Sequence, residues 1–148
     1  RQFVAASASA AAGLLVARNP SVQGLGRIKV LTTMATWCAA CKSELPQMAR
    51  LREAFTTEEL GLFGVPVDPK DDDAKLGSYR EKYQPAYLLL TGLSEEELKS
   101  VQAAILAELK TEALPSTLIL DADGKVLEAT TGLPTISTLR RLLDGASR

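Results

Sequence analysis

The sequence predicts an α/β fold in which a central mixed β-sheet is flanked by helices. Two features of the chain predict it. Short apolar runs alternate with helical patterns over most of its 148 residues, and near the end two such runs are joined by a short turn before a last helical pattern. Alternation of strands and helices produces parallel strand pairs, whereas a tight turn produces an antiparallel pair. The length fits a single domain that can bury a substantial core.

The composition is that of an ordinary soluble globular protein, with 46% apolar and 24% charged residues. A net charge of −1 gives no indication of a nucleic-acid partner or of an anionic membrane surface. The chain begins at Arg1 and not at methionine, which is typical of a mature chain or an excised domain. No secretory signal with a basic region, an apolar core and a cleavage site can be recognised.

An alanine-rich run over residues 3–17 favours a helix by intrinsic propensity. It is shorter than the roughly 20 apolar residues that span a membrane, so we expect a helix packed on the edge of the domain; the alternative is the end of a longer membrane anchor. Asn19 and Pro20 end the run, because a residue before proline disfavours the helical conformation. The chain therefore divides into an N-terminal helical extension and connector, residues 1–24, and a domain over residues 25–148.

The domain is organised around two cysteines that follow its first apolar, β-branched run. A strand is expected over residues 27–33, Cys38 and Cys41 follow it, and a helix continues to Phe55 with a kink at Pro46. This order places Cys38 at a helix N-terminus, where unpaired backbone N–H groups stabilise a thiolate. Cysteines in such positions have pKa values lowered from about 8.5 to roughly 3.5–7.5, and the pair can cycle between dithiol and disulfide.

Two other interpretations of the cysteines are weaker. A zinc site needs at least three protein ligands, and the chain offers 2 cysteines and no histidine. A purely structural disulfide across so short a loop stabilises little, because the entropic benefit grows with loop length. A redox-active pair is therefore the preferred interpretation.

The segment Ala-Thr-Trp-Cys-x-x-Cys-Lys-x-Glu-Leu-Pro, residues 35–46, resembles the thioredoxin superfamily. Within it, the segment is most similar to the TlpA/ResA-like branch of extracytoplasmic thiol-disulfide oxidoreductases, some of which serve cytochrome c maturation. The resemblance covers residues 25–145 and implies a thioredoxin-like fold with an additional strand and helix. One departure is the Ala39-Ala40 dipeptide, since the family often has proline before the second cysteine. This dipeptide tunes the redox potential, so the direction of electron flow stays open.

The resemblance implies a role for each residue of the motif. Cys38 would be the exposed nucleophile that attacks a partner disulfide, and Cys41 would resolve the mixed disulfide. Glu44 matches an active-site glutamate of the ResA-like branch and would assist deprotonation of Cys41, with which it shares a helix face. Thr32 occupies the place of thioredoxin's buried aspartate and cannot act as a base, which draws attention to Glu44. The alternative for Glu44 is an ordinary solvated surface glutamate.

A second informative segment covers residues 114–120, where a proline begins an apolar strand. In the thioredoxin superfamily a cis-proline precedes this strand and packs against the cysteine pair, and Pro115 matches it by context. Such a proline would leave the backbone of Leu114 free to pair with a substrate chain by strand addition. Trp37 and Pro115 would form the apolar lips of the site.

The other elements follow from apolar patterns and turn residues. Residues 60–67 and 86–90 are expected as strands, and aspartates at 71–73 open a helix that extends to Lys82 rather than forming a metal site. A capping box begins the next helix, and a turn over residues 121–125 joins the last two strands before a helix over 134–143. The box is formed by Ser94 and Glu97, and the expected core-facing stripe of its helix is Leu98, Val101, Ile105, Leu106 and Leu109.

These observations predict a thiol-disulfide oxidoreductase that reduces disulfides of extracytoplasmic protein partners, in a role like that in cytochrome c maturation. The resemblance implies a monomer that is periplasmic or membrane-anchored, an upstream thiol-disulfide protein as its reductant, and no cofactor beyond the Cys38–Cys41 disulfide. The alternatives are a Sco-like copper-binding module and a redox-inactive interaction domain of a larger protein. Sco-like proteins have a C-x-x-x-C spacing and a distant histidine, which this chain lacks. A peroxidase is less favoured, because its lone cysteine follows a proline and threonine pattern that is absent.

Overall fold

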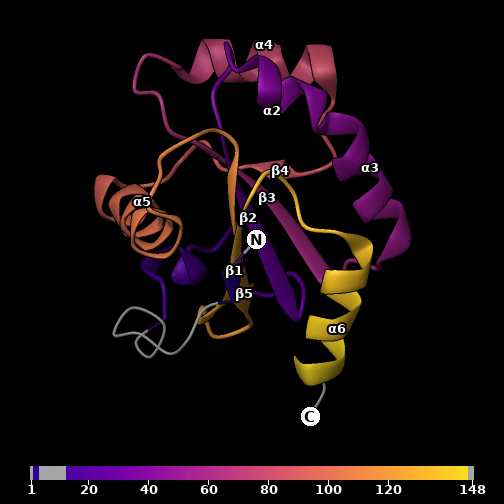
Figure 1. Cartoon of the computed structure of the whole chain (residues 1–148). Coiled ribbons are helices and arrows are strands. Elements are labelled where there is room, and N and C mark those ends of the chain that lie inside the picture. Colours follow the sequence, from indigo (N-terminus) through magenta and orange to yellow (C-terminus); the bar gives the residue numbers. More distant parts are fainter. Residues whose placement is uncertain (1, 4–12, 147–148) are drawn as a thin grey trace.

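A computed structural model describes residues 2–3 and 13–146 of the chain (Figure 1). The strands are β1 (Gln2–Phe3), β2 (Ile28–Met34), β3 (Leu60–Pro66), β4 (Leu88–Leu89), β5 (Ser116–Asp121) and β6 (Val126–Thr131). The helices are the 3-10 helix η1 (Leu15–Arg18), α2 (Ala39–Ser43), α3 (Leu45–Ala54), α4 (Asp73–Tyr83), α5 (Glu95–Leu109) and α6 (Ile136–Ala146). The strands form one mixed sheet in the order β1-β6-β5-β2-β3-β4, with helices on both faces, so the predicted fold class is confirmed.

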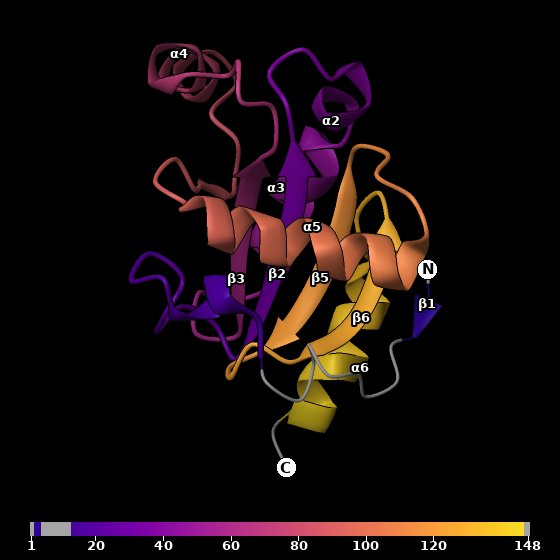
Figure 2. The same cartoon turned by 90° about the vertical axis from the view of Figure 1, so that its left-hand side faces the viewer.

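The strand β2 lies in the middle of this sheet. It runs parallel to β3, with Ile28 opposite Leu60, and antiparallel to β5, with Ile28 opposite Asp121. Every residue of β2 is buried, because helices cover both faces, and this explains its nearly continuous apolar sequence. The parallel strands β2 and β3 end at the same edge of the sheet, and α2 and α4 lie at that edge (Figures 1 and 2).

Apolar side chains form one cluster on each face of the sheet. The first contains Met48 of α3 and Leu139 of α6 and includes both cysteines. The second contains Ile105 of α5 together with Leu14 and Val16, and Figure 2 shows α5 crossing this face of the sheet. The described part of the predicted N-terminal extension therefore shares its core with the domain that follows.

The prediction of a helix over residues 3–17 is wrong at Phe3 and at residues 13–14. Residues 4–12 lie outside the described residues. Phe3 belongs to β1, and the only helical turn before β2 in the described residues is η1. Gly13 adopts a φ of +77°, and the N–H of Leu14 donates to the carbonyl of Gly124 at 2.8 Å. The segment that follows Gly13 is thus attached to the turn between β5 and β6, and the burial of Leu14 and Val16 stabilises this attachment. Within residues 2–3 and 13–146, no helix is long and apolar enough to cross a membrane.

The helix after the cysteines is broken rather than kinked. α2 ends at Ser43, α3 begins at Leu45, and Glu44 joins them with a φ of −86° and a ψ of −9°. Pro46 lies in the first turn of α3, where the missing N–H of proline costs no helical hydrogen bond. The proline therefore starts a second helix, and the predicted kink becomes a junction that positions Glu44.

Two further differences from the prediction concern the length of β4 and the buried face of α5. The strand expected over residues 86–90 is confined to Leu88 and Leu89, which pair with Phe63 and Gly64 of β3. On α5 the predicted stripe is wrong at Leu106, which is 48% exposed, and Ala104 is buried instead. The capping box of Ser94 and Glu97 is confirmed, as is the aspartate-rich start of α4, where the side chain of Asp72 accepts from the N–H of Lys75 at 2.9 Å.

Lys29 places a charged side chain in the middle of the sheet with only 2% of its surface exposed. Its ammonium group donates to the carbonyl oxygens of Val22 at 2.9 Å, Leu25 at 2.8 Å and Gly26 at 3.4 Å. Burial lowers the pKa of this lysine from its ordinary value. The carbonyl oxygens all belong to the connector before β2, so Lys29 fastens this connector to the sheet.

Replacing Lys29 by methionine is expected to lower the free energy of unfolding by about 2 kcal/mol, because buried carbonyl oxygens lose their donor. Urea unfolding measures this change. Lys99 is exposed on α5, so Lys99→Met provides a matched control that is expected to change stability by less than about 0.5 kcal/mol. Equal stabilities of the two variants would show that Lys29 does not fasten the connector.

Candidate active site

The two cysteines lie where the chain turns from β2 into α2. Cys38 is the N-cap residue of α2, and its Sγ accepts a hydrogen bond from the backbone N–H of Cys41 at 3.1 Å. The two residues form a disulfide, with their Cα atoms 5.3 Å apart. The predicted strand–turn–helix order and the helix-terminal position of the first cysteine are therefore confirmed. The position matters chemically, because an N–H aimed at Sγ favours a thiolate on Cys38 after reduction.

Both cysteines are shielded from solvent in this oxidised state. Cys38 is 5% and Cys41 7% exposed, so the prediction that Cys38 is the exposed member is wrong for this state. The two cysteines are buried to a similar extent because their disulfide packs into the core cluster that contains Met48. What distinguishes Cys38 is the hydrogen bond to its sulfur and its position next to Trp37, which is 63% exposed.

Two aspartates after β3 fix the loop that leads to Cys38. Asp71 is buried, and its carboxylate accepts from the backbone N–H of Thr36 at 2.8 Å and from the Thr36 hydroxyl at 2.6 Å. Asp68 accepts from the indole N–H of Trp37 at 2.6 Å. Neither role was predicted from the sequence: Asp71 was assigned to the start of a helix, and Asp68 was given no role.

The hydrogen bond between Asp68 and Trp37 is expected to depend on pH. The backbone N–H of Lys70 and the indole N–H of Trp37 both donate to Asp68 and lower the pKa of its carboxyl group. A lowered pKa in the folded state means that the interaction is complete above the ordinary carboxyl pKa of about 3.9 and is lost as the pH falls through the lower folded value.

Trp37 is the only tryptophan of the chain, so its fluorescence reports this interaction. Acidification is expected to change the emission of Trp37 with a midpoint below about pH 3.9, while the protein stays folded by circular dichroism. Asp68→Ala is expected to abolish the transition. A transition that persists in this variant would show that another group controls Trp37.

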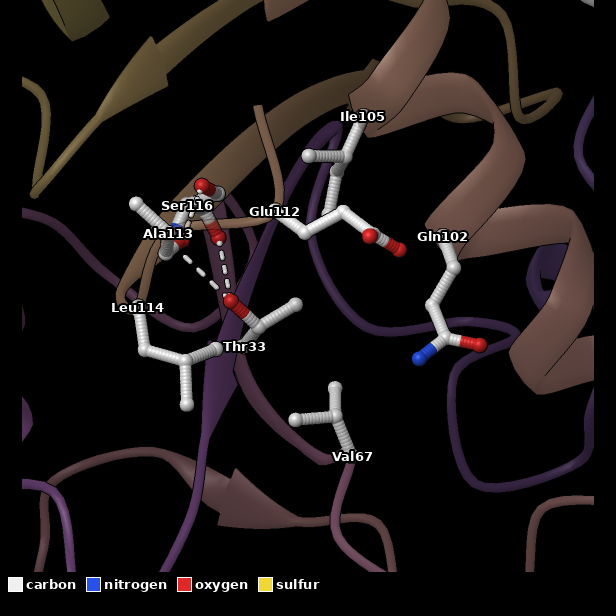
Figure 3. A pocket seen from close by; sticks show the side chains of 8 residues that line it. All are labelled: Thr33, Val67, Gln102, Ile105, Glu112, Ala113, Leu114 and Ser116. Atoms are coloured by element: carbon white, nitrogen blue, oxygen red, sulfur yellow. Dashed lines mark hydrogen bonds between the residues drawn. The ribbon is translucent and has the colours of Figure 1, made fainter. Parts of the chain in front are cut away.

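The loop before β5 lies beside the cysteine loop. The peptide bond between Leu114 and Pro115 is cis. The hydroxyl of Thr33 in β2 accepts from the backbone N–H of Ser116 at 2.9 Å and lies 3.2 Å from the Ser116 carbonyl (Figure 3). Among the described residues, no hydrogen bond engages the backbone of Leu114. The geometry thus leaves this backbone available, as strand addition by a substrate chain requires.

A small cavity of about 40 Å³ lies next to Leu114, between α5 and the end of β2. Figure 3 shows Ile105 and Val67 on its apolar walls and the side chains of Gln102 and Glu112 at its polar side.

The predicted pair of apolar lips is only partly realised, because Trp37 is exposed whereas Pro115 is buried.

A second, narrower cavity brings Cys41, Glu44 and Pro115 together. Its volume of about 10 Å³ corresponds to roughly one water molecule. Tyr87 and Leu133 also line it, and sequence reasoning gave no role to either. Burial raises the pKa of Tyr87 above its ordinary value, so this hydroxyl stays neutral and does not compete as a base.

Glu44 is half-buried, and its carboxylate is directed toward the Pro115 loop. A Cβ built on Gly132 would lie 3.1 Å from Oε1 of Glu44. Gly132 itself adopts a φ of +71°, and its N–H donates to the carbonyl of Pro115 at 2.8 Å. This placement beside the cavity of Cys41 favours a functional carboxylate over an ordinary solvated surface glutamate.

Comparison with known sequences places this geometry in a family. The model of the AhpC/TSA family matches residues 18–129. The thiol-disulfide oxidoreductase ResA of Bacillus subtilis (strain 168) is 25% identical over 119 residues, which cover 80% of this chain and 61% of that protein. ResA of Bacillus cereus (strain ATCC 10987 / NRS 248) is 24% identical over 118 residues, covering 80% and 62%. The chain thus spans about three fifths of the length of these curated relatives.

Comparison with solved structures confirms the thioredoxin-like fold. The thio-disulfide isomerase from Thermus thermophilus has a TM-score of 0.61 at 22% identity, with 82% of this chain and 80% of that chain covered. The thioredoxin-related protein from Neisseria meningitidis serogroup B has a TM-score of 0.58 at 18% identity, with 82% and 86% covered. At these identities the likeness concerns the fold alone. Together with the sequence matches, it confirms the resemblance to the TlpA/ResA-like branch of the thioredoxin superfamily.

Proposed function

The chain belongs to the AhpC/TSA family, and we propose that it is a thiol-disulfide oxidoreductase that exchanges electrons with protein partners through Cys38 and Cys41. One observation carries this proposal: the two cysteines form a disulfide at the start of α2, with the sulfur of Cys38 facing the N–H of Cys41. The Cys38–Cys41 pair holds both electrons of the exchange, so the proposed reaction needs no bound cofactor.

In the first step the reduced protein attacks a partner disulfide. The thiolate of Cys38, stabilised by the N–H of Cys41, forms a bond to one partner sulfur. The partner S–S bond breaks, and its second sulfur leaves as a thiolate that takes up a proton. The product is a mixed disulfide between Cys38 and the partner. We assign Cys38 this role because it is the N-cap residue and adjoins the exposed Trp37.

In the second step Cys41 resolves the mixed disulfide. Its thiol loses a proton, the resulting thiolate attacks Sγ of Cys38, and the first partner sulfur leaves as a thiolate. The Cys38–Cys41 disulfide is restored, and the partner has gained two electrons and two protons overall. We assign proton removal from Cys41 to Glu44, directly or through one water, because both residues line the same narrow cavity.

We assign substrate contacts to the two loops around the disulfide. The unpaired backbone of Leu114 would pair with the partner chain next to its cysteine. Trp37 would cover the reacting sulfurs from the solvent side, and Pro115 would contact them from the buried side. These contacts orient the incoming disulfide along the axis on which Sγ of Cys38 attacks.

We further propose that the protein reduces disulfides of extracytoplasmic partners, in a role like that in cytochrome c maturation. The support is the similarity to proteins named thiol-disulfide oxidoreductase ResA and the resemblance of the cysteine motif to the TlpA/ResA-like branch. The protein would then act as a monomer outside the cytoplasm, and a membrane or soluble thiol-disulfide protein would return it to the dithiol form.

Equilibration of the Cys38–Cys41 pair with a dithiothreitol or glutathione series tests this direction of electron flow. The account predicts a reduction potential near −270 mV, about that of thioredoxin, where the dithiol is a good reductant. A potential near −120 mV would make the disulfide a strong oxidant and contradict the reducing role. A tenfold change in the equilibrium corresponds to about 30 mV, so the two outcomes are clearly resolved.

A further inference from the structure

A groove of about 370 Å³ lies between α2 and α4, beside the cysteine loop. Three lysines line it, Lys42 from α2 and Lys75 and Lys82 from α4, and none of the described residues that line it is acidic. The whole chain carries a net charge of −1. The groove is therefore a local concentration of positive charge on a nearly neutral protein.

Neighbouring carboxylates in the described part of the chain form no direct ion pair with the lysines of the groove, although the charge of Lys75 helps to lower the pKa of the Asp68 carboxyl group. Among the described residues, none of the three lysines forms an ion pair. Nearby aspartates bind other donors: Asp68 accepts from Trp37 and Asp71 from Thr36, both in the cysteine loop. Asp72 accepts from the backbone N–H of Lys75 and caps α4. The ammonium groups of Lys42, Lys75 and Lys82 thus remain available to an anionic ligand.

Two of these ammonium groups converge on one aromatic ring. Nζ of Lys42 lies 5.4 Å, and Nζ of Lys82 5.3 Å, from the ring centroid of Tyr83. Desolvation raises the pKa of the Tyr83 hydroxyl, but the charges of Lys42 and Lys82 outweigh it, so the pKa lies below its ordinary value. The two like charges repel one another, and a carboxylate bound between them would relieve this repulsion.

The groove adjoins the loop and the helix that carry the two cysteines. Thr36 lines it and is only two residues before Cys38, and Lys42 immediately follows Cys41. α2, which begins with the cysteines, forms one wall of the groove, and α4 forms the other. A polypeptide whose cysteine is joined to Cys38 can therefore place the residues next to that cysteine in the groove.

We propose that the groove between α2 and α4 binds an acidic segment of the protein partner, adjacent to the partner cysteine that reacts with Cys38. This inference rests on the proposed thiol-disulfide exchange and names the chemistry of its substrate. Carboxylates of the segment would pair with Lys42, Lys75 and Lys82. The aliphatic parts of the acidic side chains would lie against the ring of Tyr83. A flexible polypeptide fits this open groove better than a single small anion, because the lysines are distributed over two helices.

The test uses the reduced protein and two synthetic peptides, each with one intramolecular disulfide, that differ only in glutamates or glutamines beside the cysteines. The second-order rate constant for the acidic peptide is expected to exceed that for the neutral peptide by about tenfold at low ionic strength. The advantage is expected to shrink as salt is added. Lys75→Gln and Lys82→Gln should each reduce it, while leaving the rate for the neutral peptide unchanged. Lys99→Gln, on the exposed surface of α5, is the matched control.

Three results would overturn the proposal. The first is equal rates for the two peptides, and the second is an acidic advantage that survives in both lysine variants. The third is a Lys82→Gln variant that loses as much rate toward glutathione disulfide as toward the acidic peptide, which would identify a site for small anions. If the wild type reduced neither peptide, the proposed function would fail instead. Binding of a cysteine-free acidic peptide to the oxidised protein, weakened in Lys82→Gln, would then still support the groove, and no binding would overturn it.

Discussion

Replacing Cys41 by serine is expected to trap the partner on Cys38 as a stable mixed disulfide. The variant keeps the nucleophile and the N–H that faces its sulfur, since that N–H belongs to the backbone of residue 41. It lacks the thiol that releases the partner, so the reaction stops after its first step. Mixing the variant with a disulfide peptide and measuring the intact mass without added thiols detects the adduct. Turnover with added reductant is expected to fall by at least about 10³-fold.

The matched control is Cys38→Ser, which retains the buried Cys41 and is expected to form little adduct with the same peptide. Sγ of Cys41 faces the carbonyl oxygen of Thr33 at 3.9 Å, which disfavours a thiolate, whereas Sγ of Cys38 accepts from a backbone N–H at the start of α2. An adduct forming faster on Cys41 than on Cys38 would reverse the assignment of nucleophile and resolving cysteine. Since both residues are almost equally shielded in the oxidised state, this comparison tests the assignment directly.

Replacing Glu44 by glutamine is expected to slow the resolving step by about 10²-fold near neutral pH, because general-base assistance contributes roughly 10²–10⁴-fold. The side chain keeps its size, so the junction between α2 and α3 and the packing beside Gly132 are expected to be preserved. Stopped-flow measurement of mixed-disulfide decay follows this step. In the variant the rate should keep rising with pH toward about 8.5, where an ordinary thiol ionises without help.

The control for Glu44 is Glu53→Gln, an exposed glutamate of α3 outside the cavity of Cys41. This variant is expected to resolve the mixed disulfide at the wild-type rate with the wild-type pH profile. Equal rates and profiles for Glu44→Gln and the wild type would contradict the proposed role. Glu44 would then contribute only to the junction between the two helices.

Most of the fold is predictable from the sequence because the informative patterns are local. The largely apolar and β-branched sequence of β2 and the apolar run of β3 are typical of strands buried on both faces in a sheet between helices. The strand–turn–helix order around Cys38 follows from neighbouring residues, as does the capping box that begins α5. Each of these predictions depends on a few adjacent side chains.

The missed features depend on contacts between distant segments. Asp71 binds Thr36 across a separation of 35 residues, and Asp68 binds Trp37 across 31. Local patterns assign the aspartates at 71–73 to a helix start, which is true of Asp72, the N-cap residue of α4, and of Asp73 in its first turn, but not of Asp71. The buried Lys29 was overlooked for a similar reason, since its charge is satisfied by carbonyl oxygens that no side-chain pattern reveals.

The position of residues 13–18 depends on tertiary contacts that local propensity does not reveal. Gly13 turns the chain toward the β5–β6 turn, and Leu14 and Val16 then reach the core. The burial predicted for Leu106 was wrong for a geometric reason. α5 buries Ala104, so its buried stripe is shifted away from Leu106. A periodic pattern gives the existence of a helix more reliably than the exact face that is buried.

The most direct test of the central claim is the stoichiometry of electron transfer. The reduced protein is mixed with an excess of a disulfide peptide in the absence of any other thiol, and free thiols and disulfides are then assigned by mass spectrometry. The account predicts that one peptide dithiol appears for each Cys38–Cys41 disulfide formed, and that neither Cys38→Ser nor Cys41→Ser completes the transfer. A wild-type protein that retained both thiols while the peptide stayed oxidised would contradict the claim that this chain is a thiol-disulfide oxidoreductase.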